Sequence, residues 1–434
     1  GIYFDTLNAQ NVGPDQSGFS RATVNPITND FGQTWLSGNP AAGISPLTDP
    51  FPLRPDGTRF DVPVGTGQGL LARAGIGWNF YGQSVPRARQ QRWRIDLQRQ
   101  LGADMVVTVG YAGSYSDRIR VSRRLDALPG QYWNTTQERN NALASNLNQN
   151  VPNPFHIQNF QELRISDPIA YQALESRGYF LSPTIPKHML LRPYPHMNNI
   201  SAVGSTDGEV KTHSFEAMFQ RRFARGFTLH ANYTALYERD RDYYHNEFDP
   251  LPSWRQTNAG VPHRIAATGI WELPFGRGRA FLQSGLASAL FGGWQIAGTY
   301  EWQPGPLLDW GNIFYYGDLA DIRKGKRTLD RWFNTDGFER NPQRTPASFQ
   351  ARLFPTRVDG VRADGLNRID ANIQRDFRLT ERFTLQLRMD ALNVANRSQF
   401  EPPNRDPIST NFGRVTNNTS STMRFLLFQA RIKF

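Results

Sequence analysis

The sequence contains no cysteine, which excludes a disulfide framework and any metal site built from thiolates. It also has no run that approaches the ~18 consecutive apolar residues required by a transmembrane helix. The first ten residues, GIYFDTLNAQ, include no methionine and no basic segment followed by an apolar one, so they are not a secretory signal peptide. Because this segment resembles the end of a strand, we expect the 434 residues to be the C-terminal portion of a longer protein.

Lysine is scarce: 49 residues are basic, but only positions 187, 211, 324, 326 and 433 are lysines. A net charge of +11 is typical of some nucleic-acid-binding proteins. Here, however, the arginines are spread along the chain among acidic residues rather than clustered. We therefore expect no nucleic-acid partner; anionic lipid headgroups are an alternative partner, and a coding bias toward arginine is the simpler explanation of the charge. Aromatic residues make up 12% of the chain, which argues against simple disorder.

Motifs for catalysis and cofactor binding are absent from the sequence. The glycine-rich segment GTGQGLLARAGIG (65–77) matches neither the phosphate-binding loop nor the dinucleotide-binding pattern, and we interpret it as a loop or strand. The segment ERDRDYYHNEFD (238–249) places oxygen ligands at alternate positions, so calcium is an alternative to a solvated loop there. Its interleaved arginines argue against calcium. The candidate calcium ligands in this segment are Asp240, Asp242, His245, Glu247 and Asp249. We predict that the protein is not an enzyme and that it binds no cofactor and no metal.

Apolar and polar residues alternate in a series of strand-like segments. In the last one, Phe428, Ile432 and Phe434 share one face, and the polar residues between them share the other. Most segments are about ten residues long, matching the ~9–11 residues with which a tilted strand crosses a bilayer. The ten predicted strands are 1–4, 92–101, 104–115, 212–223, 227–237, 264–276, 293–302, 367–377, 383–394 and 422–434.

Short and long connections alternate between these strands, as in outer-membrane barrels with short periplasmic turns and long external loops. Three short links are predicted at 102–103, 224–226 and 378–382, and a fourth, 274–292, is longer and is predicted to contain a small helix. The predicted long loops are 5–87, 118–210, 238–262, 303–366 and 395–421.

Aromatic residues gather at the predicted strand ends, where membrane barrels carry interfacial girdles. The ring-bearing residues at the short-turn ends are Phe223, Phe227, Trp271, Trp294, Phe377, Phe383 and Phe434; Tyr237 and Trp302 lie at the opposite ends. The polar parity of strands 367–377 and 383–394 is rich in charges of both signs, as expected for a lumen wall. We therefore predict an all-β fold: a segment of an antiparallel transmembrane β-barrel with about ten strands.

Several motifs in order resemble the C-terminal barrel of Oar-like TonB-dependent outer-membrane receptors of the acidobacterial type. They are GIYFDTLNAQ, YWN followed by VPNPF (151–155), LPFGRGR (273–279), GGWQIAGTYEWQPGPLL (292–308), NRIDANIQRDFRLTERFTLQLRMDALNVANRSQF (367–400), NFGRVT (411–416) and the terminal phenylalanine. The resemblance implies a partial barrel of a 22-strand family, with the plug domain and the TonB contact lying in a missing N-terminal part. It also implies that the barrel assembly machinery reads Phe434, Ile432 and Phe428.

The function expected from this resemblance is uptake, or export, of a large solute such as an oligosaccharide or peptide across the outer membrane of a Gram-negative cell. Expected partners are outer-membrane lipid and lipopolysaccharide, the assembly machinery, the TonB complex and the solute. Aromatic residues in two external loops are candidate ligand contacts: Tyr132, Trp133, Trp310, Tyr315, Tyr316 and Trp332, with Arg323, Lys324, Lys326 and Arg327 close to the last four. A structural or adhesive barrel without transport and a soluble all-β carbohydrate-binding protein remain alternatives.

Overall fold

The computed structural model describes residues 1–4, 27–28, 30–48, 50–51, 53, 57–60, 71, 73–80, 86–419 and 423–434. Much of the predicted 5–87 loop and part of the glycine-rich segment 65–77 lie outside these residues. None of the helices in the described part of the chain is long and apolar enough to span a membrane.

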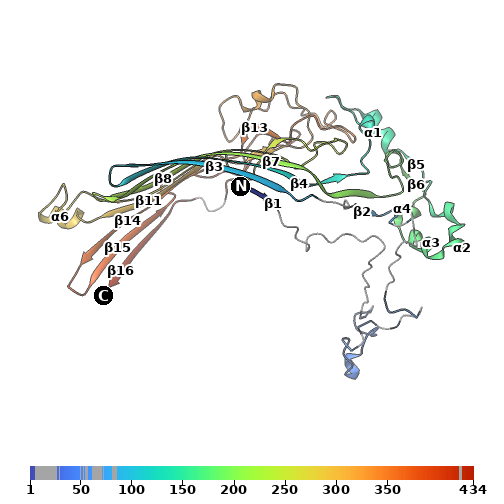
Figure 1. The fold of residues 1–434 in the computed structure, drawn as a ribbon, viewed down its shortest axis with the longest axis horizontal. Helices are drawn as coiled ribbons and strands as arrows, with labels where there is room; N and C mark the ends of the chain where they lie inside the picture. Colours follow the sequence, from blue (N-terminus) through green and yellow to red (C-terminus); the bar gives the residue numbers. More distant parts are fainter. Residues whose placement is uncertain are drawn as a thin grey trace.

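Ten antiparallel strands form one large sheet, in which every strand pairs with the next one along the path, as the sequence predicts. The sheet is long and curved, with α6 and the carboxyl terminus at one end and α1 to α4 at the other (Figure 1). The strands in spatial order are β1 (Ile2–Phe4), β3 (Arg89–Leu101), β4 (Met105–Arg124), β7 (Asn199–Ala224), β8 (Phe227–Arg241), β10 (His263–Glu272), β11 (Gln295–Gln303), β14 (Leu366–Arg378), β15 (Thr384–Leu392) and β16 (Phe425–Lys433). Two short strands pair with interior strands of this order: β2 (Gly77–Phe80) runs parallel to β7, and β9 (Arg255–Gln256) pairs with β8.

Strand register places the apolar residues of all these strands on one face. Directly paired residues in a sheet point to the same side. Ile95 is paired with Tyr111 and Tyr111 with Phe215, and at the other margin Ile373 pairs with Met389 and Met389 with Phe428. The apolar parity predicted for each strand is therefore continuous across the sheet, and this is the face expected to contact lipid.

The opposite face carries charges that pair across strands. Arg94 on β3 lies 2.9 Å from Glu216 on β7, and Arg264 on β10 lies 2.7 Å from Glu301 on β11. Gly110 of β4 lies between these strands, and a Cβ there would stand 2.3 Å from an Asp96 carboxylate oxygen, so the Asp96 side chain would have to move. The polar wall predicted for β14 and β15 is present, since the Gln386 amide donates to Asp376 across the pair at 2.9 Å.

The turns at the α6 end are short. Arg225 and Gly226 join β7 to β8, and both have positive φ (54° and 79°), as required of the two central residues of a type I′ hairpin turn. The helix predicted in the fourth connection is α6 (Gly285–Phe291).

The predicted limits of the loop 118–210 are wrong. β4 continues to Arg124 and β7 begins at Asn199, with paired residues as far out as Arg124 and Ser201. Val121 and Ile200 are buried in this extension, and β2 pairs with β7 there, from Asn199 to Ala202. The connection that remains is 125–198.

The long connections at the other end contain their own elements. Two small antiparallel sheets pair β5 (Asn150–Pro152) with β6 (Thr184–Pro186), and β12 (Leu307–Asp309) with β13 (Arg357–Arg362). The helices are α1 (Asn141–Asn148), α2 (Leu163–Ser166), α3 (Pro168–Glu175), α4 (Gly178–Leu181) and α5 (Lys187–Leu190), with 3-10 turns at Pro40–Ala42, Gly130–Tyr132, Ile157–Phe160 and Leu319–Arg323.

A buried aromatic core organises the segment between β11 and β14. The Trp310 ring stacks on Phe338 at 5.4 Å and meets Phe333 and Phe354 edge-on at 5.0 and 5.6 Å. Phe412 joins this core from the last long connection. The loops that cap the sheet are thus packed around a hydrophobic centre of their own.

The face assignment predicts different effects for neighbouring substitutions on β14. Ile373→Arg places a charge on the apolar face and should cost about 2–4 kcal/mol of unfolding free energy near the bilayer centre. Asn372→Arg, on the opposite face and paired with Asp390, should cost far less. Unfolding of each variant in lipid vesicles checks this, and equal losses would contradict the assignment of faces.

The loop core predicts a local loss of stability when its central ring is removed. Trp310→Ala should lower the local opening free energy of residues 305–363 by about 3–5 kcal/mol, because it leaves a cavity among three other rings. Tyr316→Ala is the control, since that side chain is half exposed and should cost under about 1 kcal/mol. Hydrogen exchange measures both, and protection unchanged in Trp310→Ala would contradict this account.

Candidate functional site

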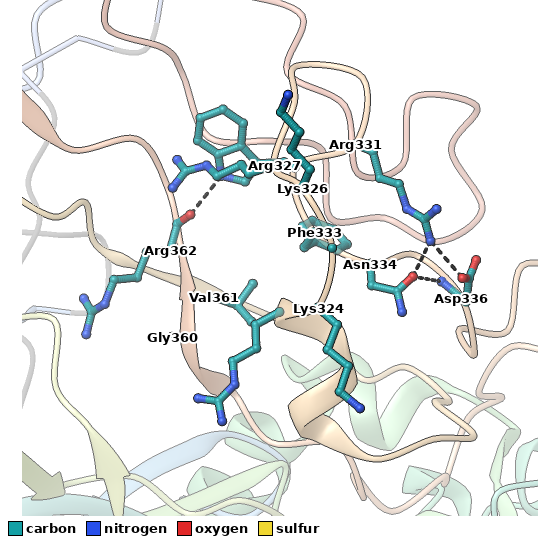
Figure 2. Close-up of a pocket in the computed structure, with 13 residues that line it drawn as sticks. Lys324, Lys326, Arg327, Arg331, Phe333, Asn334, Asp336, Gly360, Val361 and Arg362 are labelled. Atoms are coloured by element: carbon teal, nitrogen blue, oxygen red, sulfur yellow. Dashed lines mark hydrogen bonds and ion pairs between the residues drawn. The ribbon is translucent and has the colours of Figure 1, made fainter.

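A pocket of about 420 Å³ opens in the segment that connects β11 to β14. One wall is the chain around Arg323–Arg327, another is Arg331–Asp336, and the third is β13 (Figure 2). β13, which forms the third wall, lies among the long connections and away from α6 (Figure 1).

Cationic side chains dominate the pocket. Its charged lining residues are Arg323, Lys324, Lys326, Arg327, Arg331 and Arg362, against the single carboxylate of Asp336. That carboxylate is already paired with Arg331 at 2.8 Å, and Lys324 is paired with Asp321. Arg323, Lys326 and Arg362 form no ion pair within the described part of the chain. The pocket therefore has a net positive charge and suits an anionic group.

Trp332 holds two walls of the pocket together. Its indole N–H donates to the Arg362 carbonyl oxygen at 2.8 Å, which ties the 331–336 wall to β13 (Figure 2). The Arg327 guanidinium lies over the same ring, 3.4 Å from its centroid. Arg327 is also 3.8 Å from Asp364, which accepts a hydrogen bond from Arg397 at 2.9 Å. Arg327 therefore contacts both a ring and a carboxylate.

Partial burial affects two of these guanidinium groups. It lowers the pKa of Arg327, an effect that Arg397 adds to and Asp364 opposes. Burial likewise lowers the pKa of Arg362. Both groups remain charged at neutral pH, because arginine's ordinary pKa is so high. Having lost part of their hydration, they gain more from a bound anion than fully solvated arginines do.

The predicted aromatic contacts have different surroundings in the structure. Trp310 and Tyr315 are buried in the loop core, and Trp332 belongs to that core while also lining the pocket. Tyr316 is half exposed, and its hydroxyl lies 3.3 Å from the Gln137 carbonyl oxygen. Their rings mainly pack the loop, and the face of Trp332 is covered by Arg327.

The other two predicted contacts lie in the connection 125–198. Trp133 packs between Phe248 and Phe349, and its indole N–H donates to the Leu128 carbonyl oxygen at 2.9 Å. Tyr132 is partly buried beside it, at the end of a 3-10 turn. Neither residue lines the basic pocket.

Sequence reasoning placed four of the basic residues near the aromatic ones but missed Arg331 and Arg362. Arg331 directly precedes Trp332, which is a usable signal, whereas Arg362 reaches the pocket only because β13 folds back onto the 332 region. It also missed the contact between the connection 125–198 and the connection from β11 to β14. There the buried Gln350 amide donates to the carbonyl oxygens of Asn134 and Thr136 at 2.9 and 2.8 Å.

Arginine side chains form ion pairs with carboxylates of the acidic segment 238–249. Arg255 bridges Asp240 and Asp242 at 2.9 and 2.7 Å, and Glu247 accepts from Arg124 at 3.1 Å. Among the residues that the structure describes, no group of three or more histidine, aspartate or glutamate side chains is placed to hold a metal ion.

Phe428 and Ile432 are exposed on the apolar face of β16, and Phe434, which follows the end of that strand, is exposed as well. Phe428 and Ile432 lie opposite Met389 and Leu385 of β15. Their side chains are therefore directed to the side predicted to contact lipid.

Comparison with solved structures finds only distant likeness. The outer membrane transporter YddB from Escherichia coli is 10% identical, with a TM-score of 0.34, over 83% of this chain and 34% of its own. The ferripyoverdine receptor of the outer membrane of Pseudomonas aeruginosa is 11% identical, with a TM-score of 0.33, over 80% and 27%. The siderophore receptor PiuA from Acinetobacter baumannii is 9% identical, with a TM-score of 0.34, over 82% and 30%.

The chain thus spans about a third or less of the length of these structures, and the superpositions are too loose to support a functional argument. Comparison with curated proteins gives no match. By contrast, the profile of the outer membrane beta barrel domain family matches residues 1–429. The soluble alternative is therefore rejected: the chain belongs to the outer membrane beta barrel domain family and is located in the outer membrane.

Proposed function

We propose that this chain is part of the barrel of an Oar-like, TonB-dependent receptor that carries a large solute across the outer membrane. The observation that carries the proposal is the arrangement of the sheet. One face is apolar, the other is lined with paired charges, and an organised basic pocket lies among the long connections at one end. A transported solute would first bind in such a pocket and then pass along the polar face of the barrel.

The edges of the sheet support a role within a larger barrel. β1 and β16 are the first and last strands of the order, and each has one paired neighbour among the described strands. In hydrocarbon an unpaired backbone group costs several kcal/mol, so both edges need further strands. The proposed receptor supplies these strands, together with the plug and the segment that contacts TonB. The assembly machinery would read Phe434, Ile432 and Phe428 on the last strand.

The pocket favours a solute that carries acidic groups, such as an acidic oligosaccharide or an acidic peptide. Six cationic side chains surround it, and one carboxylate opposes them. The aromatic face that would stack on a neutral sugar is covered at Trp332 by the Arg327 guanidinium. Charge, rather than ring stacking, would therefore select the solute.

The experiment measures uptake and binding by the complete receptor. Fluorescent polygalacturonate and an acidic peptide are offered to cells with and without TonB, beside a neutral maltooligosaccharide. Uptake of one acidic probe, lost without TonB, is expected. Uptake that does not depend on TonB, or none by cells that still bind the probe, would contradict energised transport and favour a pore or an adhesive barrel.

A double substitution in the pocket tests the binding site independently of transport. Arg323→Gln combined with Lys326→Gln should weaken binding of the acidic probe about tenfold, or about 1.4 kcal/mol, and should reduce its salt dependence. Arg344→Gln is the matched control, because Arg344 is an exposed arginine of the same connection that does not line the pocket. Equal binding by the double variant and the control would exclude the pocket as the capture site.

A further inference from the structure

The connection between β10 and β11 exposes an unusual amount of apolar surface. Leu286 of α6 is 83% exposed and Leu290, one helical turn later, is 63% exposed. Three more large apolar side chains are exposed close by: Phe281, Leu282 and Phe291. The helix itself contains no charged residue. Exposed apolar side chains gathered in one connection of an outer-membrane protein mark a contact surface.

The helix is fastened to the apolar side of the sheet. The Trp294 indole N–H and the Arg375 guanidinium both donate to the Leu290 carbonyl oxygen, at 3.1 and 2.7 Å. Arg375 is two residues after Ile373 in β14, so both side chains are on the apolar face. Trp294 contacts Phe377, which is on the same face, edge-on at 6.2 Å. The end of α6 thus lies on the outer rim of the sheet, at the short-turn end (Figure 1), and not over the polar face.

Arg375 is a cation on a surface that otherwise faces lipid. Its guanidinium lies over Phe377, 4.1 Å from the ring centroid, and is paired with no carboxylate within the described residues. A charged group at this position is stable only where it reaches polar headgroups, as interfacial arginines do. Arg221 occupies a comparable place over Phe227 but already has Asp104 at 3.4 Å. Arg375 therefore retains its capacity for an external anion.

We propose that α6 and Arg375 form a phospholipid-binding site at the periplasmic leaflet of the outer membrane. The apolar side chains of α6 enter the interfacial layer, and the Arg375 guanidinium binds a lipid phosphate while it holds the Leu290 carbonyl oxygen. Continuity with the lipid-facing surface identifies lipid as the occupant, because a plug or a solute would contact the polar face. The inference rests on the outer-membrane location and is independent of the proposed transport.

The test uses the complete receptor in nanodiscs and native mass spectrometry. Phosphatidylglycerol is compared with a galactosyl diacylglycerol of the same chains, which has no phosphate. The wild-type receptor should retain phosphatidylglycerol preferentially, and Arg375→Gln should reduce that retention at least fivefold, with partial rescue in Arg375→Lys. Arg382→Gln, in the turn after β14, is the control and should behave as wild type. Equal retention by Arg375→Gln and wild type would overturn the headgroup site.

A second measurement examines α6 without disturbing Arg375. Because this chain has no cysteine, Leu286→Cys and Arg382→Cys provide single labelling positions in it for an environment-sensitive dye. Brominated acyl chains should quench the dye at position 286 and not at 382, whereas iodide in the water should do the opposite. Quenching of position 286 by iodide to the same extent as position 382 would show that α6 lies in water, and the proposal would fail.

Discussion

The hydrogen-bonded register of the ten strands is the constraint on which the rest of this structure depends. Because paired residues share a face, one strand with a fixed orientation determines the orientation of all the others. A slip of a single residue would turn the apolar side chains of a strand toward the polar face. The ladder from β3 to β16 keeps this parity between Ile95 and Phe428, and its register shifts lie at the strand ends, at 116–124 of β4 and at 221–224 of β7. The lipid-facing surface, the charged wall and the position of Arg375 all follow from this register.

The long connections obey a different principle. They lie beyond the membrane-crossing part of the sheet, so their stability comes from a buried core rather than from strand pairing. Trp310 and its neighbouring rings supply that core, and the Gln350–Asn134 hydrogen bonds join two connections that are distant in sequence. Contacts such as the Trp332–Arg362 hydrogen bond hold together walls that carry six like charges, and these charges repel one another.

The sheet could be predicted from sequence because its signals are local. Strict alternation, the Arg225-Gly226 turn and the small helix before Gly292 each lie within a few residues. The outer parts of β4 and β7 were missed because Val121 and Ile200 are buried there and β7 pairs with β2, which comes from a distant part of the chain. The pocket was only partly predictable. Arg323 to Arg327 are neighbours in the chain, whereas Arg362 joins them through the long-range contact with Trp332.

The central claim is that this sheet crosses the outer membrane with its apolar parity toward lipid. It is tested most directly by a cysteine scan of residues 369–377 of β14 in native outer-membrane vesicles, with a membrane-soluble and a water-soluble thiol reagent. Labelling by the membrane-soluble reagent should peak at 369, 371 and 373 and fall at 370, 372 and 374, and the water-soluble reagent should give the reverse pattern. A profile without this two-residue period, or one in which every position reacts only from water, would contradict the account.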